Sequence, residues 1–217
     1  MAHFLGLGLT HYPLLAGTDE HMASLLRWTL ADPGIPAAAK DPANWPEAMR
    51  EEWGTDQGVT AAAQHRKMLV DNLARCRQAL DEFKPDVVVV WGDDQYENFR
   101  EEIIPPFCVL AYGDVEAEPF ELMTERGSPN AWGLPDDTTI TLHGDPANAR
   151  LLTTALIERG FDMAYSYERR KDSAFPHAIA NTQLFLDYPN AGAKFDYPMI
   201  PITVNCYGPH VIARRGG

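Results

Sequence analysis

Apolar residues in this chain follow two patterns, continuous runs and helical spacing. Residues 86–91, "DVVVVW", form a continuous run after Pro85, which is typical of a strand covered on both faces. The apolar residues before this run recur at steps of three and four: Leu69, Leu73, Cys76, Leu80 and Phe83. This spacing predicts an amphipathic helix over residues 60–83, which Pro85 ends.

Other short apolar segments predict further strands. Residues 4–10 are apolar and contain glycine, and they predict a first strand that ends at "THYP". The segment "IIPPFCVLAYG" predicts a strand entered through two prolines, which places it at a sheet edge or a bend. The segments "FDMAYSY" and "MIPITVNCY" indicate two more strands.

A second helix is predicted between Asp145, a typical N-cap, and Gly160, where a helix would stop. Pro146 stands at its first helical position, where proline is favoured. Residues 31–58, rich in proline and tryptophan, are expected to form a long irregular segment that serves as a lid or an interface. Residues 114–137 are acidic and predict a loop. The alternation of strands and helices predicts an α/β layered domain with a central mostly parallel or mixed sheet flanked by helices.

The length of 217 residues suits one domain with a full core, so we expect a single domain over residues 1–217. Only eleven residues follow Cys206, with no closing helix. This ending indicates either a short subunit or a missing C-terminal portion.

Composition and charge exclude several classes of protein. A net charge of −13 opposes binding to nucleic acid or to an anionic membrane, because the electrostatic interaction is repulsive. The sequence contains no run of about 18 apolar residues, so no membrane span is expected. The N-terminal "MAHFLGLGL" lacks the basic start of a signal peptide. We therefore expect a cytoplasmic protein. Its three widely spaced cysteines are expected to be reduced core residues: Cys76, Cys108 and Cys206.

Polar residues capable of metal binding or proton transfer follow several predicted strands. They are His11, Asp93, Asp94, Gln95, His177 and His210. Because ligands bind outside the carboxyl ends of parallel strands, we expect these side chains to meet at one edge of the sheet. His65 stands in the early turns of the 60–83 helix, which runs opposite to the following strand, so it is expected at the same edge.

Each of these residues also has a purely structural interpretation. His65 continues the apolar stripe of its helix and is equally compatible with a hydrogen-bonded core histidine. Asp93 and Asp94 are good residues for capping the following turn. Glu97 belongs to a charged run with residues 100–102 that predicts a solvated surface. The functional interpretation is stronger for the set than for any single residue.

Neutral imidazoles with a carboxylate and open coordination positions suit non-haem Fe(II). A similar set with a bound water suits zinc hydrolysis. A further histidine with a pKa near neutrality can act as acid and base. The sequence contains no GxGxxG, Walker A, HExxH or GxSxG motif, so it gives no support for nucleotide binding or serine hydrolysis.

Four segments, in this order, resemble a known family: "GLGLTHYPLL", "KPDVVVVWGDDQYENFREEIIPPFCV", "SAFPHAIANT" and "YPMIPITVNCYG". They are similar to the class III extradiol ring-cleavage dioxygenases, the superfamily of the catalytic subunit of protocatechuate 4,5-dioxygenase. The similarity extends from about residue 4 to 208. The order and spacing of the segments carry the resemblance.

This resemblance implies an Fe(II) enzyme that opens catecholic rings with O2, using two histidines and a glutamate as ligands and another histidine as acid/base. His11 matches the first ligand, and His177 matches the acid/base histidine. Gln95 stands where the second ligand histidine is expected, so Gln95 or His65 would complete the set. The glutamate usually lies beyond the "PITVN" strand, outside this chain. The carboxylate would then come from Asp94, another subunit or a missing C-terminal half.

The function expected from these observations is extradiol cleavage of a small aromatic, protocatechuate- or gallate-like, with O2 by a cytoplasmic homo- or hetero-oligomer. Tyr12, Asp94 and His210 are expected to contact the substrate. Two alternatives stay open. One is a non-catalytic, metal-free subunit of the same fold, and the other is a zinc hydrolase that uses His11 with Asp93 or Asp94.

Overall fold

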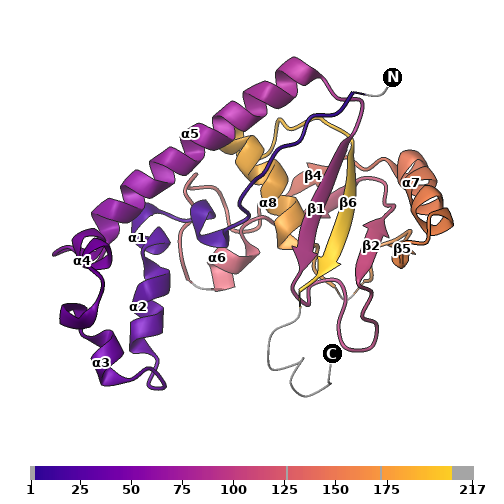
Figure 1. The fold of residues 1–217 in the computed structure, drawn as a ribbon. Coiled ribbons are helices and arrows are strands. Elements are labelled where there is room, and N and C mark those ends of the chain that lie inside the picture. The colour runs from indigo at the N-terminus through magenta and orange to yellow at the C-terminus, as the bar shows by residue number, and fades with distance from the viewer. Residues whose placement is uncertain (1–2, 126, 172, 207–217) are drawn as a thin grey trace. The chain divides into compact units, whose positions relative to one another are not determined.

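A four-stranded mixed sheet forms the centre of one of the two units into which backbone contacts divide the chain (Figure 1). The computed structural model describes residues 3–125, 127–171 and 173–206. The sheet unit contains the described residues of 1–11, 74–119 and 138–217, and the helical unit contains those of 12–73 and 120–137. A single domain over the whole chain stays a prediction.

The strand order in the sheet is β1-β6-β2-β5. The strands are β1 (Val88–Asp94), β6 (Met199–Asn205), β2 (Phe107–Leu110) and β5 (Met163–Ser166). β1 pairs in parallel with β6, and β2 pairs in parallel with β5, whereas β2 and β6 are antiparallel. The sheet is therefore mixed, and the strands predicted from "DVVVVW", "IIPPFCVLAYG", "FDMAYSY" and "MIPITVNCY" are confirmed. β2 lies between β6 and β5, so the sheet edge predicted for it is wrong. β1 is not covered on both faces as predicted, because Val89 and Trp91 are exposed.

The strand predicted over residues 4–10 is wrong. These residues form no regular element and pair with no strand in the described part of the chain, and Phe4 is 92% exposed. Gly6 and Gly8 supply no side chain for packing, and a Cβ at either position would contact nothing within 4 Å. Glycine weakens strand pairing for this reason. The segment instead borders a cavity alongside β1.

Helices cover both faces of the sheet, as expected for a layered α/β domain. Cys108 and Leu110 of β2 belong to a core that includes Ile179 of α8 (His177–Leu186). The alternate residue Val109 belongs to a second core, which includes Ala149 of α7 (Pro146–Glu158). Since successive strand residues point to opposite faces, α8 and α7 pack on opposite sides of the sheet (Figure 1).

The local signals for both predicted helices are confirmed. α5 (Val59–Phe83) contains the predicted 60–83 helix, and its last turns pack in the sheet unit through Leu80. Asp145 is the N-cap of α7, where its carboxylate accepts a hydrogen bond from the backbone N–H of Asn148 at 3.0 Å. The sheet unit also contains one 3-10 turn, η3 (Tyr188–Asn190).

Residues 114–137 are not the single loop predicted from their acidity. β3 (Val115–Ala117) pairs antiparallel with β4 (Ile140–Leu142) in a small second sheet of the sheet unit. α6 (Glu121–Glu125) follows in the helical unit. Ala117, Ile140 and Leu142 are buried in the core that also contains α8, and this burial explains why the short strands form.

The helical unit contains short helices where a long irregular segment was predicted over residues 31–58. It contains η1 (Pro13–Ala16), α1 (Asp19–Met22), α2 (Ser24–Ala31), α3 (Ala37–Lys40), η2 (Pro42–Asn44) and α4 (Glu47–Trp53). About half of residues 31–58 are therefore helical. Trp45 and Trp53 pack edge to face with ring centroids 5.4 Å apart, which gives these helices a small aromatic core. Their role as a lid or an interface stays a prediction. In the described ranges, no helix is both long and apolar enough to span a membrane.

Candidate metal centre

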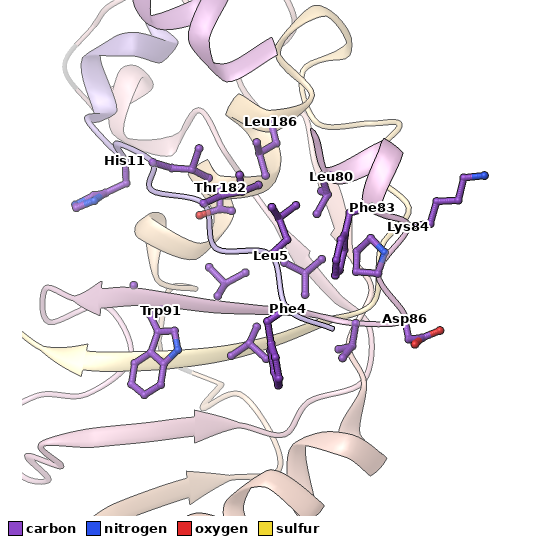
Figure 2. A pocket seen from close by; sticks show the side chains of 18 of the residues that line it. Phe4, Leu5, His11, Leu80, Phe83, Lys84, Asp86, Trp91, Thr182 and Leu186 are labelled. Atoms are coloured by element: carbon purple, nitrogen blue, oxygen red, sulfur yellow. The ribbon is translucent and has the colours of Figure 1, made fainter. Parts of the chain in front are cut away.

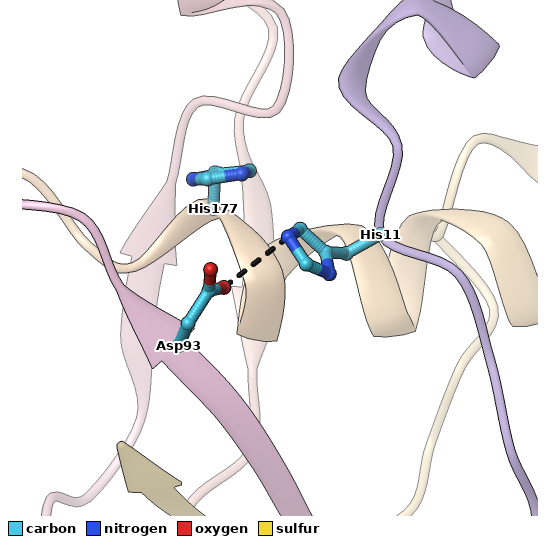
Figure 3. A group of neighbouring side chains, drawn as sticks. All are labelled: His11, Asp93 and His177. Carbon is cyan, nitrogen blue, oxygen red and sulfur yellow. Dashed lines mark ion pairs between the residues drawn. The ribbon is translucent and has the colours of Figure 1, made fainter. Parts of the chain in front are cut away.

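His11, Asp93 and His177 converge in the sheet unit (Figure 3). Each offers one ligand atom, and the three atoms lie within 4.8 Å of one another. His11 Nε2 is 3.2 Å from Asp93 Oδ1, and the two imidazole rings have centroids 5.2 Å apart. Residues separated by up to 166 positions in the sequence therefore form one cluster, as the sequence predicted for these three.

Asp93 stands next to last in β1, and its two carboxylate oxygens have different surroundings. Oδ2 accepts a hydrogen bond from Gln95 Nε2 at 2.6 Å. Oδ1 is buried and accepts no hydrogen bond, although His11 Nε2 faces it at ion-pair distance. A buried carboxylate oxygen without a hydrogen bond is costly unless a cation or another donor approaches it. This oxygen is therefore a good candidate to bind a metal ion.

His177 is the first residue of α8, not part of a loop as predicted. Its backbone N–H donates to Glu97 Oε1 at 3.0 Å, and its Nδ1 pairs with the same oxygen. Burial lowers the pKa of His177, but the hydrogen bond and charge of Glu97, with smaller effects from Asp93 and Asp94, raise it by more. Glu97 thus holds His177, and the solvated surface predicted for this glutamate is wrong.

The route to His177 also differs from the predicted one. β5 runs in the same direction as β2 and opposite to β1, so its carboxyl end lies at the other edge of the sheet. The connection from β5 to α8 returns to the site, where Ser173 Oγ contacts Asn98 Oδ1 at 3.4 Å and Arg170 pairs with Glu102 at 2.9 Å. His177 therefore reaches Asp93 through this connection and not by following a parallel strand.

His11 is anchored by its backbone. Asn181, one turn after His177 on α8, donates its side-chain amide to the His11 carbonyl at 3.0 Å and is 4% exposed. Residues four apart lie on the same face of a helix, so one face of α8 holds both histidines. A polar residue four positions after His177 could have been found in "HAIAN" once that segment was recognised as a helix.

Gly92 allows α8 to lie close to β1. A Cβ at this position would lie 2.7 Å from Ile179 Cδ1 and 3.1 Å from Ala178 Cβ, both on α8. Such contacts are too short for a well-packed interior, so any larger residue would push the helix or its side chains away. The glycine therefore contributes to the spacing between Asp93 and His177.

Asp94 is buried at 4% exposure and caps the turn that follows β1. Its Oδ1 accepts hydrogen bonds from the backbone N–H groups of Asn98 and Phe99, both at 3.4 Å. Burial is the main cause of its raised pKa. The capping alternative is therefore present in the structure, and a substrate contact by Asp94 stays a prediction.

Other predicted site residues have different positions. Gln95 is exposed and contacts the cluster through Asp93. His65 is an exposed residue of α5, which contradicts the core-histidine alternative, and Tyr12 is partly buried beside η1. Both belong to the helical unit, and their roles stay predictions. His210 lies outside the described residues.

The cysteines do not all behave as core residues. Cys108 is buried and Cys76 partly buried, but Cys206 is exposed, so the prediction fails for Cys206. The pKa of the Cys206 thiol is raised by partial burial, by the charge of Asp93 and by a hydrogen bond to that carboxylate. This thiol therefore lies next to the cluster.

An apolar cavity of about 840 Å³ adjoins His11 (Figure 2). Its walls come from the N-terminal segment, the end of α5, β1 and α8, all in the sheet unit. Apolar side chains dominate the lining, among them Leu9, Leu80, Trp91 and Leu186. A cavity of this size and character is large enough for an aromatic ring.

No family model matches the chain. It is similar to enzymes named 2,3-dihydroxyphenylpropionate/2,3-dihydroxicinnamic acid 1,2-dioxygenase. The protein from Comamonas testosteroni is 29% identical over 159 residues, which cover 72% of this chain and 42% of the relative. The protein from Mycobacterium sp. (strain MCS) is 30% identical over 138 residues, or 61% and 35% of the two chains. A relative from Pseudomonas putida is 29% identical over 133 residues, again 61% and 35%.

These similarities support an extradiol dioxygenase relationship. The aligned regions cover only 35–42% of the length of these relatives. The similarity agrees with the resemblance found in the sequence at the level of extradiol dioxygenases that act on catechols.

Proposed function

We propose that this chain carries the metal centre of a class III extradiol dioxygenase, which opens the ring of a catechol with O2. The observation that carries this proposal is the convergence of His11, Asp93 and His177 within 4.8 Å. The names of the relatives support the reaction type.

The three side chains fit Fe(II) by the chemistry of their donors. Two imidazoles and one carboxylate are the ligand set of many non-haem Fe(II) oxygenases, which leave other coordination positions open. The buried Asp93 Oδ1 lacks a hydrogen bond, and a cation would satisfy it. Bound Fe(II) would supply a centre at which the two catechol oxygens and O2 can be held together. In this proposal His177 takes the place for which Gln95 or His65 was expected, and Asp93 supplies the carboxylate that was expected from Asp94, another subunit or a missing C-terminal half.

His177 is assigned here as a ligand because Glu97 occupies its Nδ1 and leaves Nε2 as the other ring nitrogen. Histidines that bind metals commonly donate their second ring N–H to a carboxylate. The acid/base role implied by the family resemblance is the alternative for the same side chain. The two roles predict different metal contents for a His177→Ala variant.

The cavity beside His11 favours an aromatic substrate. Its lining is mainly apolar, so a ring buried there would gain free energy by leaving water. The resemblance implies a protocatechuate- or gallate-like compound, and the relatives are named for 2,3-dihydroxyphenylpropionate. All of these contain adjacent ring hydroxyls, so the proposed substrate class is the catechol unit.

The test starts with metal-free protein loaded anaerobically with Fe(II). Catechol, protocatechuate, gallate and 2,3-dihydroxyphenylpropionate are then supplied in separate reactions with air. We expect O2 uptake and a yellow ring-opened product with at least one of them, and loss of both in Asp93→Asn. His143→Ala is a matched control, because His143 and Asp114 form a second pair at 3.2 Å outside the cluster.

Two results would contradict the proposal. Wild-type protein that binds no divalent metal would favour the non-catalytic alternative. Protein that hydrolyses a substrate with zinc and without O2 would favour the hydrolase alternative. The expected assembly as a homo- or hetero-oligomer is measured on the same sample by light scattering.

A further inference from the structure

We propose that Glu97 is a positioning residue that fixes the tautomer and orientation of His177. The carboxylate holds the proton on Nδ1 and leaves the Nε2 lone pair for the cluster with His11 and Asp93. The metal-binding consequence rests on the proposed function, whereas the tautomer does not.

Glu97 ties two distant segments together with both of its oxygens. Oε1 accepts the backbone N–H of His177 at 3.0 Å and also pairs with its Nδ1. Oε2 accepts the backbone N–H of Gln95 at 3.0 Å. The side chains of Glu97 and His177 are only 18% and 23% exposed. This burial and the three contacts leave the glutamate little freedom to turn away.

Glu97 also satisfies the start of α8. The first N–H groups of a helix have no partner inside the helix. The N-cap residue of α8 is Pro176, which makes no side-chain hydrogen bond to it. Glu97 supplies an acceptor from eighty residues away, and its negative charge is favourable at a helix N-terminus. One carboxylate therefore places both the backbone and the ring of His177.

The chemical consequence follows from the two ring nitrogens of a neutral histidine. One carries the proton and the other carries the lone pair, and the hydrogen bond at one nitrogen decides the state of the other. A carboxylate only accepts, so Glu97 selects the Nδ1–H form. The lone pair is then on Nε2, where either a metal ion or a substrate proton can be bound.

The direct test is ¹⁵N NMR of metal-free protein at alkaline pH, where the imidazoles are neutral. We expect wild-type His177 to show the Nδ1–H tautomer. Glu97→Ala should shift His177 toward Nε2–H, and Glu97→Gln should fall between the two because its amide oxygen still accepts a hydrogen bond. An Nε2–H signal from His177 in wild-type protein would overturn the proposal. The same His177 tautomer in all three proteins would also overturn it.

The second measurement is the affinity for Zn²⁺, used as a redox-inert ion in calorimetry. Loss of a carboxylate that orients a metal-binding histidine typically weakens metal affinity about 10–100-fold. We expect this loss in Glu97→Ala and a smaller one in Glu97→Gln. Glu101→Ala removes the same charge from the same run and should bind like wild type. Circular dichroism verifies that each variant is folded.

The two measurements separate the failure of one proposal from the failure of the other. If wild-type protein binds no Zn²⁺, the proposed metal centre is wrong, while the NMR signals still decide the role of Glu97. If Zn²⁺ binds equally well to wild type and Glu97→Ala, Glu97 does not position a metal ligand and the metal-binding part of the inference is wrong. Equal losses in Glu97→Ala and Glu101→Ala would also contradict it.

Discussion

Asn181 and His177 lie one turn apart on α8, and together they fix both histidines of the cluster. Asn181 donates to the backbone carbonyl of His11 at 3.0 Å, while His177 contributes its own ring. The helix is therefore the common support of residues that are far apart in the sequence. Changes in how α8 packs should alter the site without touching a candidate ligand.

Asn181→Ala should weaken the site by releasing His11. The carbonyl of His11 loses its donor, and we expect the free energy of unfolding to fall by about 1–2 kcal/mol. Metal affinity should fall about tenfold, because a residue that orients a ligand is removed. Zn²⁺ calorimetry and urea unfolding measure the two effects. Thr182→Ala is the matched control, since the Thr182 hydroxyl donates to Ala178 O within the helix.

Gly92→Ala should destabilise the protein by pushing against α8. The added methyl group would lie 2.7 Å from Ile179 Cδ1, and Ile179 is fully buried. Overpacking of this kind typically costs about 1–3 kcal/mol. Ile179→Val removes that Cδ1 atom, so the double variant should recover part of the loss in a double-mutant cycle. Simple additivity of the two single variants would show that this contact is not the cause.

His177→Ala distinguishes the two roles of this histidine. If His177 is a ligand, the variant should lose most of its Fe(II) together with its activity. If His177 is only the acid/base, iron content should remain near the wild-type value while turnover falls by about 10²–10⁴-fold. Iron analysis after desalting, compared with turnover under the same conditions, gives the answer. His143→Ala should change neither quantity.

Cys108 should resist thiol reagents in the folded protein far more than Cys206, which is exposed. Burial raises the pKa of Cys108 to about 12, so only about 10⁻³ of this thiol is ionised at pH 9. The thiolate is the reactive form, and Cys108 is also almost fully shielded from solvent. Mass spectrometry of labelled peptides should find Cys108 modified only after denaturation. Rapid labelling of native Cys108 would contradict its placement in the core.

Strong local patterns made much of the fold predictable. The valine run indicates a strand along the whole of β1. The spacing of Leu73 and Leu80 indicates a helix through several turns of α5. α8 was missed because Ala178 through Leu186 is nearly all buried, so no polar stripe marks its helical period. The strand over residues 4–10 failed for the opposite reason: local composition suggests a strand, but pairing depends on a neighbour elsewhere.

The site was partly predictable because polar residues at strand ends are unusual. His11, Asp93 and His177 were all selected because they follow predicted strands, although only Asp93 stands at the end of a strand in the structure. Their partners were not, because Glu97 and Asn181 act through contacts 80 and 170 positions along the chain. Glu97 in particular stands in a charged run, and no local pattern separates a glutamate that holds a histidine from its solvated neighbours.

The position of β1 has a consequence for handling the protein. Within the described residues β1 pairs only with β6, and Val89 and Trp91 are 42% and 58% exposed. Open strand edges with apolar side chains promote aggregation, because backbone groups of two molecules can join their sheets. Concentrated samples should therefore cluster with time, and a lysine in place of Trp91 should keep them dispersed.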